Sequence, residues 1–330
     1  MKKTTIVTNL ASNQLLNLPP KLNSLIDINI VSSLHDVEVF ADLLPKVEVL
    51  WIGVHERVDA TLVRKFPKLK VLATSSTGLT HIDEESLSSG KISLVSLKNE
   101  REFLSSISAT SELAWGLFIA AHRRILIADR REHFSSANRN SYFSRQIKGM
   151  SIGIIGLGRI GSQIANYALA FGAKVSYTDI EEVVSPNTIQ FQSLEDLCRE
   201  SDAIFITAST GFAGYEPILG AKEISWLKEN VILINVSRGG QVNEIELLKA
   251  LSEKKISGYA TDVLQLEETT YPSSITLKDV KQSVWRGENL LVTPHLGGAC
   301  YDALDLVNEF ILEKILVEIK RLDSTESTLR

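Results

Sequence analysis

A glycine-rich segment near the middle of the chain has the spacing that holds the phosphates of a dinucleotide. An apolar run over residues 152–155 leads directly into Gly156, Gly158 and Gly161, which form the pattern G-x-G-x-x-G. The first glycine permits a tight turn, the second lets backbone approach a pyrophosphate, and the third lets the next helix pack against the strand. The first N–H groups of that helix suit a phosphate. The cofactor-binding residues predicted here are Gly156, Gly158, Arg159, Ile160 and Gly161.

An acidic residue beyond the next strand indicates which dinucleotide is bound. Asp179 lies 18 residues after Gly161 and follows an apolar run over residues 174–177. A carboxylate there accepts hydrogen bonds from the ribose hydroxyls of NAD and repels the 2′-phosphate of NADP. Taken alone, Gly161 could serve helix packing and Asp179 a turn. The complete order of strand, glycines, helix, strand and acid favours a nucleotide site, and the predicted cofactor is NAD.

The second half of the chain carries the residue types that hydride transfer to a carbonyl requires. Arg238 directly follows an apolar run, and a guanidinium can grip a carboxylate through two parallel hydrogen bonds. His295 follows Pro294, and an imidazole gives and takes protons near neutral pH. Glu267, or Asp262 before it, would raise the pKa of His295 and hold its tautomer if paired with it.

Each of these residues also has a purely structural interpretation. Arg238 could make a surface salt bridge, His295 could be a structural histidine, and either acid could be a solvated loop residue. The sequence alone does not bring the groups together, although ligands of open α/β sheets bind at the carboxyl ends of strands.

Apolar runs that alternate with helical stretches predict two parallel-sheet units. We expect strands at residues 3–7, 26–31, 47–52 and 69–74, and again at 152–155, 174–177, 203–207, 231–235, 256–262 and 290–293. Helices are expected at residues 111–129, 160–171 and 301–322. The polar stretch 130–148 is either a solvated connection or an arm that packs on a second subunit.

Bulk properties exclude several classes of protein. A length of 330 residues suggests two domains, and a net charge of −5 gives no reason to expect a nucleic-acid or membrane surface. Two cysteines, Cys198 and Cys300, predict neither a disulfide framework nor a metal site. The N-terminus lacks the apolar run of a signal peptide, and residues 113–121 are too short to cross a membrane. We therefore expect a cytoplasmic protein.

The order of these motifs resembles the D-isomer-specific 2-hydroxyacid dehydrogenase family, which includes D-3-phosphoglycerate and D-lactate dehydrogenases. The resemblance begins near Leu69. Its elements are STGLTHID at 76–83, TSELA at 110–114, LGRIG at 157–161, NVSRGG at 235–240, TDV at 261–263 and TPHLGG at 293–298.

The resemblance implies a fold and a set of roles. The fold would be α/β, with two Rossmann-like doubly wound parallel-sheet domains: an NAD-binding domain, 105–295, inserted into a substrate domain, 1–104 and 296–330. A homodimer would form through the long helix after Glu112. Arg238 would bind the substrate, His295 would be the general acid/base and Glu267 its partner. The substrate carboxylate would also meet Ser76, Thr77 and Gly78. Further residues near the cofactor would be Val236, Ser237, Arg238, Asp262, His295, Gly297 and Gly298.

The predicted activity is reversible reduction of a 2-keto acid to a D-2-hydroxy acid with NADH, with a phosphoglycerate dehydrogenase-like substrate as one option. The chain departs from the family pattern after Glu267, where Glu268 and two threonines replace an expected proline, and after the 203–207 strand. These departures concern the cleft and its substrate. The alternative is an NAD(H)-sensing regulatory protein without turnover. Formate-type oxidation is disfavoured by Glu267, and no C-terminal regulatory domain is expected.

Overall fold

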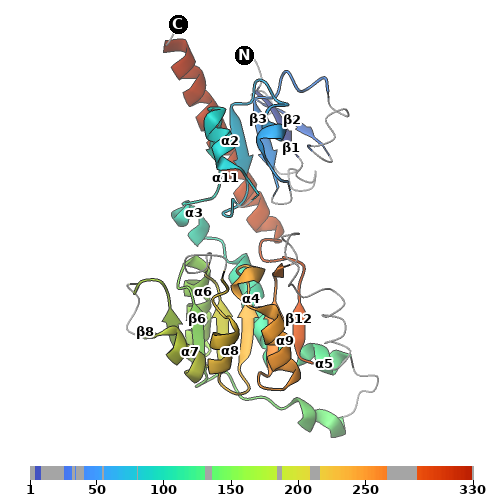
Figure 1. Cartoon of the computed structure of the whole chain (residues 1–330), viewed down its shortest axis with the longest axis vertical. Helices are drawn as coiled ribbons and strands as arrows, with labels where there is room; N and C mark the ends of the chain where they lie inside the picture. The colour runs from blue at the N-terminus through green and yellow to red at the C-terminus, as the bar shows by residue number, and fades with distance from the viewer. Residues whose placement is uncertain are drawn as a thin grey trace. The chain divides into compact units, whose positions relative to one another are not determined.

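The computed structural model describes two compact units, whose elements are coloured along the chain in Figure 1. It describes residues 4–8, 26–31, 34, 41–53, 56–79, 81–130, 136–183, 188–208, 216–265 and 288–328. Residues 1–107 and 300–330 belong to the first unit, and residues 108–299, inserted between them, form the second. The roles expected for the two domains, and their boundaries at 104/105 and 295/296, stay predictions.

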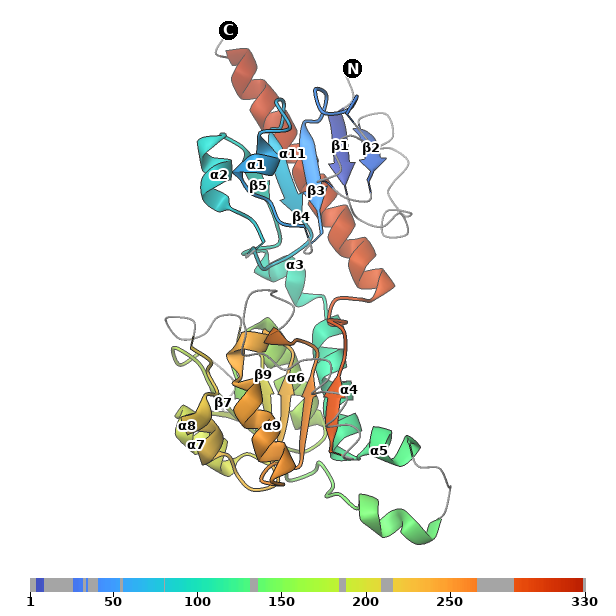
Figure 2. The ribbon, with the colours of Figure 1, turned by 45° about the vertical axis from the view of Figure 1, so that its right-hand side comes forward.

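The first unit is built on a five-stranded parallel sheet (Figure 2). Its strands, in the spatial order β2-β1-β3-β4-β5, are β1 (Thr4–Thr8), β2 (Ile26–Ile30), β3 (Val49–Ile52), β4 (Val71–Thr74) and β5 (Ser93–Val95). Every residue of β3 and β4 is buried. Both faces of these central strands are therefore covered, which is why they read as unbroken apolar runs rather than alternating ones.

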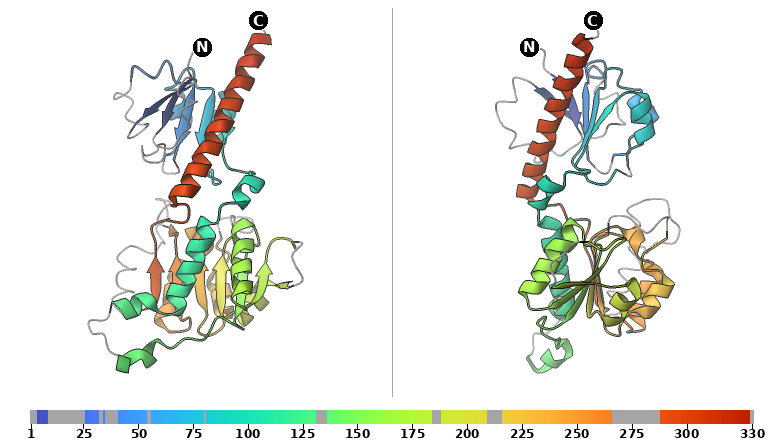
Figure 3. Two further views of the ribbon diagram at one scale, coloured as in Figure 1. Left: turned by 180° about the vertical axis from the view of Figure 1, so that it is seen from behind. Right: turned by 90° about the vertical axis from the view of Figure 1, so that its left-hand side faces the viewer.

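Helices cover both faces of this sheet (Figure 3). On one face, α11 (Tyr301–Thr328) and α3 (Arg101–Ser105) pack on the strands. Val307, Ile311 and Ile315 recur every four residues of α11 and are buried there, as the predicted helical spacing requires. On the other face lie α1 (Ala60–Val63) and α2 (Glu84–Ser89).

The second unit is built on a seven-stranded parallel sheet of order β12-β11-β10-β9-β6-β7-β8. Its strands are β6 (Ser151–Ile155), β7 (Lys174–Thr178), β8 (Ile189–Phe191), β9 (Ala203–Ile206), β10 (Ile232–Asn235), β11 (Gly258–Thr261) and β12 (Leu290–Val292). The order reverses between β6 and β9, the point at which doubly wound sheets bind ligands. The predicted fold class, two doubly wound parallel-sheet domains, is confirmed.

Helices α4 (Ala109–His122) and α6 (Arg159–Ala170) cover one face of the large sheet. Helices α7 (Leu194–Glu200), α8 (Ala221–Trp226) and α9 (Glu244–Ser252) cover the other, as Figure 3 shows. The apolar stretch Arg101–His122 is long enough by composition to cross a membrane. It is divided between α3 and α4, and Ala114, Phe118 and Ala121 of α4 are fully buried in the core. We interpret α4 as a core helix.

The prediction of one continuous helix at residues 111–129 is wrong, because the structure has two helices there. Helix α4 ends at His122, and a short helix α5 (Ile125–Asp129) starts after Arg124, which has a left-handed backbone with φ of 52°. A left-handed residue breaks the helical hydrogen-bond series and redirects the chain. Because apolar residues keep their spacing across the break, the sequence pattern did not reveal it.

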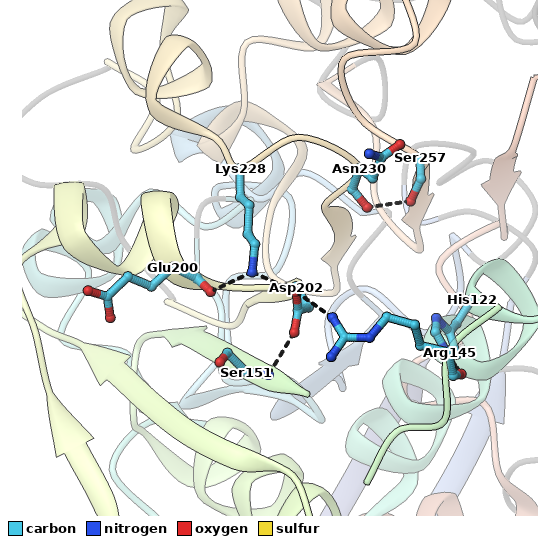
Figure 4. Close-up of polar contacts among 8 residues, drawn as sticks. All are labelled: His122, Arg145, Ser151, Glu200, Asp202, Lys228, Asn230 and Ser257. Atoms are coloured by element: carbon cyan, nitrogen blue, oxygen red, sulfur yellow. Dashed lines mark hydrogen bonds and ion pairs between the residues drawn. The ribbon is translucent and has the colours of Figure 1, made fainter. Parts of the chain in front are cut away.

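A polar cluster at the edge of the large sheet where the strands begin contacts Arg145, which precedes β6 (Figure 4). The Asp202 carboxylate accepts hydrogen bonds from Lys228 Nζ at 2.7 Å and the Ser151 N–H at 3.0 Å, and Arg145 Nη1 lies 3.3 Å away. Burial raises the pKa of Asp202, but these partners outweigh it and lower that pKa. The cluster borders a cavity of about 380 Å³. These polar groups bind one another and fix residue 145 to the domain.

His122 joins the same cluster from the end of α4. The Arg145 carbonyl lies 2.7 Å from His122 Nε2, so this nitrogen carries the proton and donates it. Burial lowers the pKa of His122. The folded protein therefore protonates this imidazole less readily than the unfolded chain does.

The first prediction concerns acid stability. The unfolded chain protonates His122 at higher pH than the folded chain does, so the free energy of unfolding should fall as the pH drops below about 6.5. His122→Gln retains an N–H donor for the Arg145 carbonyl and cannot titrate. Urea unfolding at pH 7.5 and 5.5 should show the wild type losing stability relative to this variant. Equal losses in both proteins would contradict the assignment.

Candidate active site

The glycine turn after β6 is packed so closely that side chains are excluded at two of its three glycines. Gly156 has φ of +95°, and a Cβ there would lie 2.7 Å from the Ala208 backbone. A Cβ at Gly161 would lie 2.2 Å from the Gly156 carbonyl oxygen. At Gly158, the N-cap of α6, a Cβ would meet no described atom within 4 Å. Gly158 thus leaves open space beside the start of α6, where a phosphate group would lie.

Asp179 closes the side of this turn from the end of β7. Its Oδ2 accepts a hydrogen bond from the Leu157 N–H at 2.8 Å, and its Oδ1 accepts one from the Ile180 N–H at 2.8 Å. The carboxylate is therefore anchored next to the glycine turn, and each oxygen keeps a lone pair for a ribose hydroxyl. Glycine turn, helix start and acid together fit NAD.

The turn that carries Arg238 is built by the buried side chain of Asn235 at the end of β10. Asn235 Oδ1 accepts hydrogen bonds from the N–H and the hydroxyl of Ser237, both at 3.0 Å, and its Nδ2 donates to the Arg238 carbonyl at 3.0 Å. The Arg238 guanidinium donates to the Ser237 carbonyl at 2.7 Å. Val236 and Ser237 are buried, while Arg238 is half-buried. The turn is rigid and leaves the guanidinium partly accessible.

The loop that carries His295 is held by the buried carboxylate of Asp262, 2% exposed. Asp262 Oδ1 accepts from the Thr293 hydroxyl at 2.6 Å and the Leu296 N–H at 2.7 Å, and Oδ2 accepts from the Gly297 N–H at 2.7 Å. The Asp262 carbonyl also accepts from the His295 N–H at 3.0 Å. His295 has φ of 54°, a left-handed conformation that needs such support, and it is exposed.

The structure brings most predicted site residues to one edge of the large sheet. The residues that follow the carboxyl ends of β6, β7, β10, β11 and β12 are Gly156, Gly158, Arg159, Ile160, Gly161, Asp179, Val236, Ser237, Arg238, Asp262, His295, Gly297 and Gly298. Asp262 links two of these groups, because its N–H donates to the Asn235 carbonyl at 2.9 Å.

Two other predictions stay open. Glu267 lies outside the described residues, so its pairing with His295 stays a prediction. Ser76, Thr77 and Gly78 belong to the first unit. There the Ser76 hydroxyl accepts from the Gly78 N–H at 3.1 Å and donates to the Gly78 carbonyl at 3.0 Å, which forms a tight turn.

Sequence reasoning missed three threonines that support the site. The Thr207 hydroxyl donates to the Gly156 carbonyl at 2.6 Å, and Thr110 donates to the Gly297 carbonyl at 2.9 Å. Thr293 binds Asp262, as described above. Each threonine lies within or beside a recognised strand or motif. The sequence does not show which carbonyl or carboxylate oxygen accepts the hydrogen bond from its hydroxyl. Among the described residues, no three His, Cys, Asp or Glu side chains gather as metal ligands.

Comparison with known proteins places this geometry in a family. The family model for the D-isomer specific 2-hydroxyacid dehydrogenase, NAD binding domain, matches residues 115–297. Glyoxylate reductase of Pyrococcus horikoshii is 30% identical over 295 residues, covering 86% of this chain and 83% of that protein. D-3-phosphoglycerate dehydrogenase of Methanocaldococcus jannaschii is 30% identical over 301 residues, covering 87% of this chain and 54% of that protein.

A solved structure shares the whole fold. D-lactate dehydrogenase of Aquifex aeolicus, solved with NAD and lactic acid, superposes with a TM-score of 0.76 at 24% identity and 96% coverage of each chain. The chain therefore belongs to the D-isomer specific 2-hydroxyacid dehydrogenase family. It is an NAD-dependent oxidoreductase of 2-hydroxy acids, as the sequence predicts.

The second prediction separates cofactor binding from folding at the glycine turn. Gly158→Ala adds a methyl group to open space at an ordinary φ of −76°, so the melting temperature without cofactor should not change. The methyl group would occupy the approach of the pyrophosphate, and NADH affinity should fall by about tenfold or more. Gly161→Ala, the matched variant, should instead lose about 1–3 kcal/mol of stability from the clash with Gly156. Thermal unfolding and NADH fluorescence titration measure both effects, and normal NADH affinity in Gly158→Ala would contradict the turn's role.

Proposed function

We propose that this protein reduces a small 2-keto acid to the D-2-hydroxy acid, reversibly, with His295 as the general acid. The observation that carries the proposal is the Asp262 carboxylate, which holds the His295 loop at the same sheet edge as the Arg238 turn and the glycine turn. Bound NADH supplies the hydride that the carbonyl carbon accepts.

Three side chains do the remaining chemistry. Arg238 holds the substrate carboxylate and polarises the carbonyl through its guanidinium. His295, as imidazolium, gives its proton to the carbonyl oxygen as negative charge develops there, and takes it back in the oxidative direction. Glu267 keeps His295 protonated. With one hydride and one proton added, the keto acid becomes a hydroxy acid.

The relatives direct the choice of substrate. A glyoxylate reductase and a D-3-phosphoglycerate dehydrogenase are equally identical to this chain, and the first matches over more of its own length. We therefore place short 2-keto acids such as glyoxylate first and a phosphorylated keto acid second. A role as a mere NAD(H) sensor is disfavoured, because Arg238 and His295 are retained and held in place.

A homodimer built on α4 and the segment after it fits the exposed apolar groups. Leu113, Gly116, Ile119 and Ala120 lie along one side of α4 and are half-buried or exposed, and a Cβ at Gly116 would meet no described atom within 4 Å. None of the five residues of α5 is buried. A helix this short is unstable unless something packs on it. We propose that a second copy covers α4, α5 and the exposed side chain of Phe143. Free Cys198 and Cys300 support a cytoplasmic location.

The third prediction tests the reaction. A screen of NADH oxidation with glyoxylate, hydroxypyruvate, pyruvate and 3-phosphohydroxypyruvate should find turnover, fastest with a short unphosphorylated acid. With the best substrate, His295→Ala should lower kcat by about 10² to 10⁴ and leave NADH binding intact. Tight NADH binding without turnover on any keto acid would favour the sensor instead, and near-normal turnover in His295→Ala would remove its assigned role.

The fourth prediction tests the dimer. Phe143 and Ile125 are 69% and 47% exposed, and a glutamate at either site would place a charge against the second copy. Ile125→Glu and Phe143→Glu should weaken association about tenfold or more in light-scattering dilution series. Ile245→Glu, at a residue 52% exposed on α9, is the matched control and should leave association unchanged. A wild type that is monomeric at all concentrations, or variants that associate normally, would contradict the proposal.

A further inference from the structure

A buried carboxylate that the proposed chemistry does not use lies behind the Arg238 turn. Glu244, the first residue of α9, is 1% exposed. Removing a carboxylate from water is costly unless hydrogen bonds and nearby dipoles compensate it. The start of α9 supplies part of that compensation through its positive dipole end. The buried carboxylate therefore needs hydrogen-bond donors around it.

The described partner of Glu244 is the backbone of Gln265. Glu244 Oε1 accepts a hydrogen bond from the Gln265 N–H at 3.3 Å. Gln265 lies three residues after Asp262, the residue that holds the His295 loop. Within the segment 261–265 the Thr261 hydroxyl donates to the Val263 carbonyl at 2.6 Å. Glu244 thus binds the backbone three residues beyond Asp262.

The same segment is pressed against the Arg238 turn. A Cβ at Gly239 would lie 2.1 Å from the Gln265 nitrogen and 2.1 Å from the Leu264 carbonyl carbon. The turn and the segment therefore touch without any intervening side chain. A shift of Gln265 would move both the backbone beside Arg238 and the connection to Asp262.

A described neighbour of Glu244 on β11, Tyr259, does not compete for this role. Tyr259 is fully buried, and burial, followed by the charge of Glu244, raises the pKa of Tyr259. The phenol is therefore neutral at any pH at which the enzyme works. The neutral phenol leaves the hydrogen bond from the Gln265 N–H to Glu244 Oε1 undisturbed.

We propose that Glu244 is a positioning residue, which locks residues 262–265 against the Arg238 turn and thereby sets Arg238 and His295 relative to one another. This inference rests on the proposed function. It concerns the acceptor oxygen at the end of the glutamate side chain rather than its charge.

Two conservative variants separate the effect of side-chain length at Glu244 from the effect of its negative charge. Glu244→Gln retains an oxygen at the same distance and loses the charge, whereas Glu244→Asp retains the charge and withdraws the oxygen. With the best keto acid, Glu244→Asp should lower kcat by about 10- to 100-fold and Glu244→Gln by less than about threefold. Both should keep the KM for NADH, because the glycine turn is untouched. Each kcat is calculated per mole of folded enzyme, whose concentration is taken from the number of NADH-binding sites in a titration.

A matched control addresses general damage to α9. Asn243 caps this helix, with its side chain accepting from the Glu246 N–H at 3.2 Å, and Asn243→Ala removes the cap without touching Gln265. Asn243→Ala should lower the melting temperature and leave kcat per folded enzyme unchanged. The proposal is overturned if Glu244→Asp is normal, if Glu244→Gln is the worse of the two, or if Asn243→Ala reproduces the loss. Normal turnover in His295→Ala would instead overturn the proposed function.

Discussion

The carboxylate of Asp262 accepts three hydrogen bonds from the loop that carries His295, and the rest of the candidate site depends on this interaction. The donors are the Thr293 hydroxyl and the N–H groups of Leu296 and Gly297. Because Asp262 is buried, losing the Gly297 N–H would remove the described donor to Oδ2 and leave that oxygen poorly compensated, whereas Oδ1 has two donors. The same bonds keep His295 in a left-handed conformation that an isolated loop would rarely adopt.

The parallel sheet explains why a few such side-chain interactions are sufficient. Every strand of the second unit ends at the same edge, so residues from the middle and the end of the chain arrive together without further organisation. What remains is to set the short connections after each strand. Asn235 sets the Arg238 turn, Thr207 and the glycines set the phosphate turn, and Asp262 sets the His295 loop.

Local pattern predicted the glycine turn and ten of the twelve described strands, because these depend on neighbours in sequence, but it missed β5 and β8, which are only three residues long. Short unbroken apolar runs favour strands covered on both faces, and Gly156 and Gly161 lie where backbone approaches too closely for a Cβ. Local pattern failed at Arg124, where the helical spacing continues through a left-handed residue. It also failed for Thr207 and Thr110, whose partners lie 51 and 187 residues away.

The amino-acid sequence by itself determined the parallel-sheet fold, the dinucleotide turn with its acid, and the residue types available for hydride transfer, because these follow from spacing and side-chain chemistry. Only the tertiary structure decided that Asp262 serves the His295 loop through its carboxylate and that Glu244 grips Gln265. Such assignments depend on which donors surround a buried oxygen, and burial is a property of the packed molecule that no stretch of sequence contains.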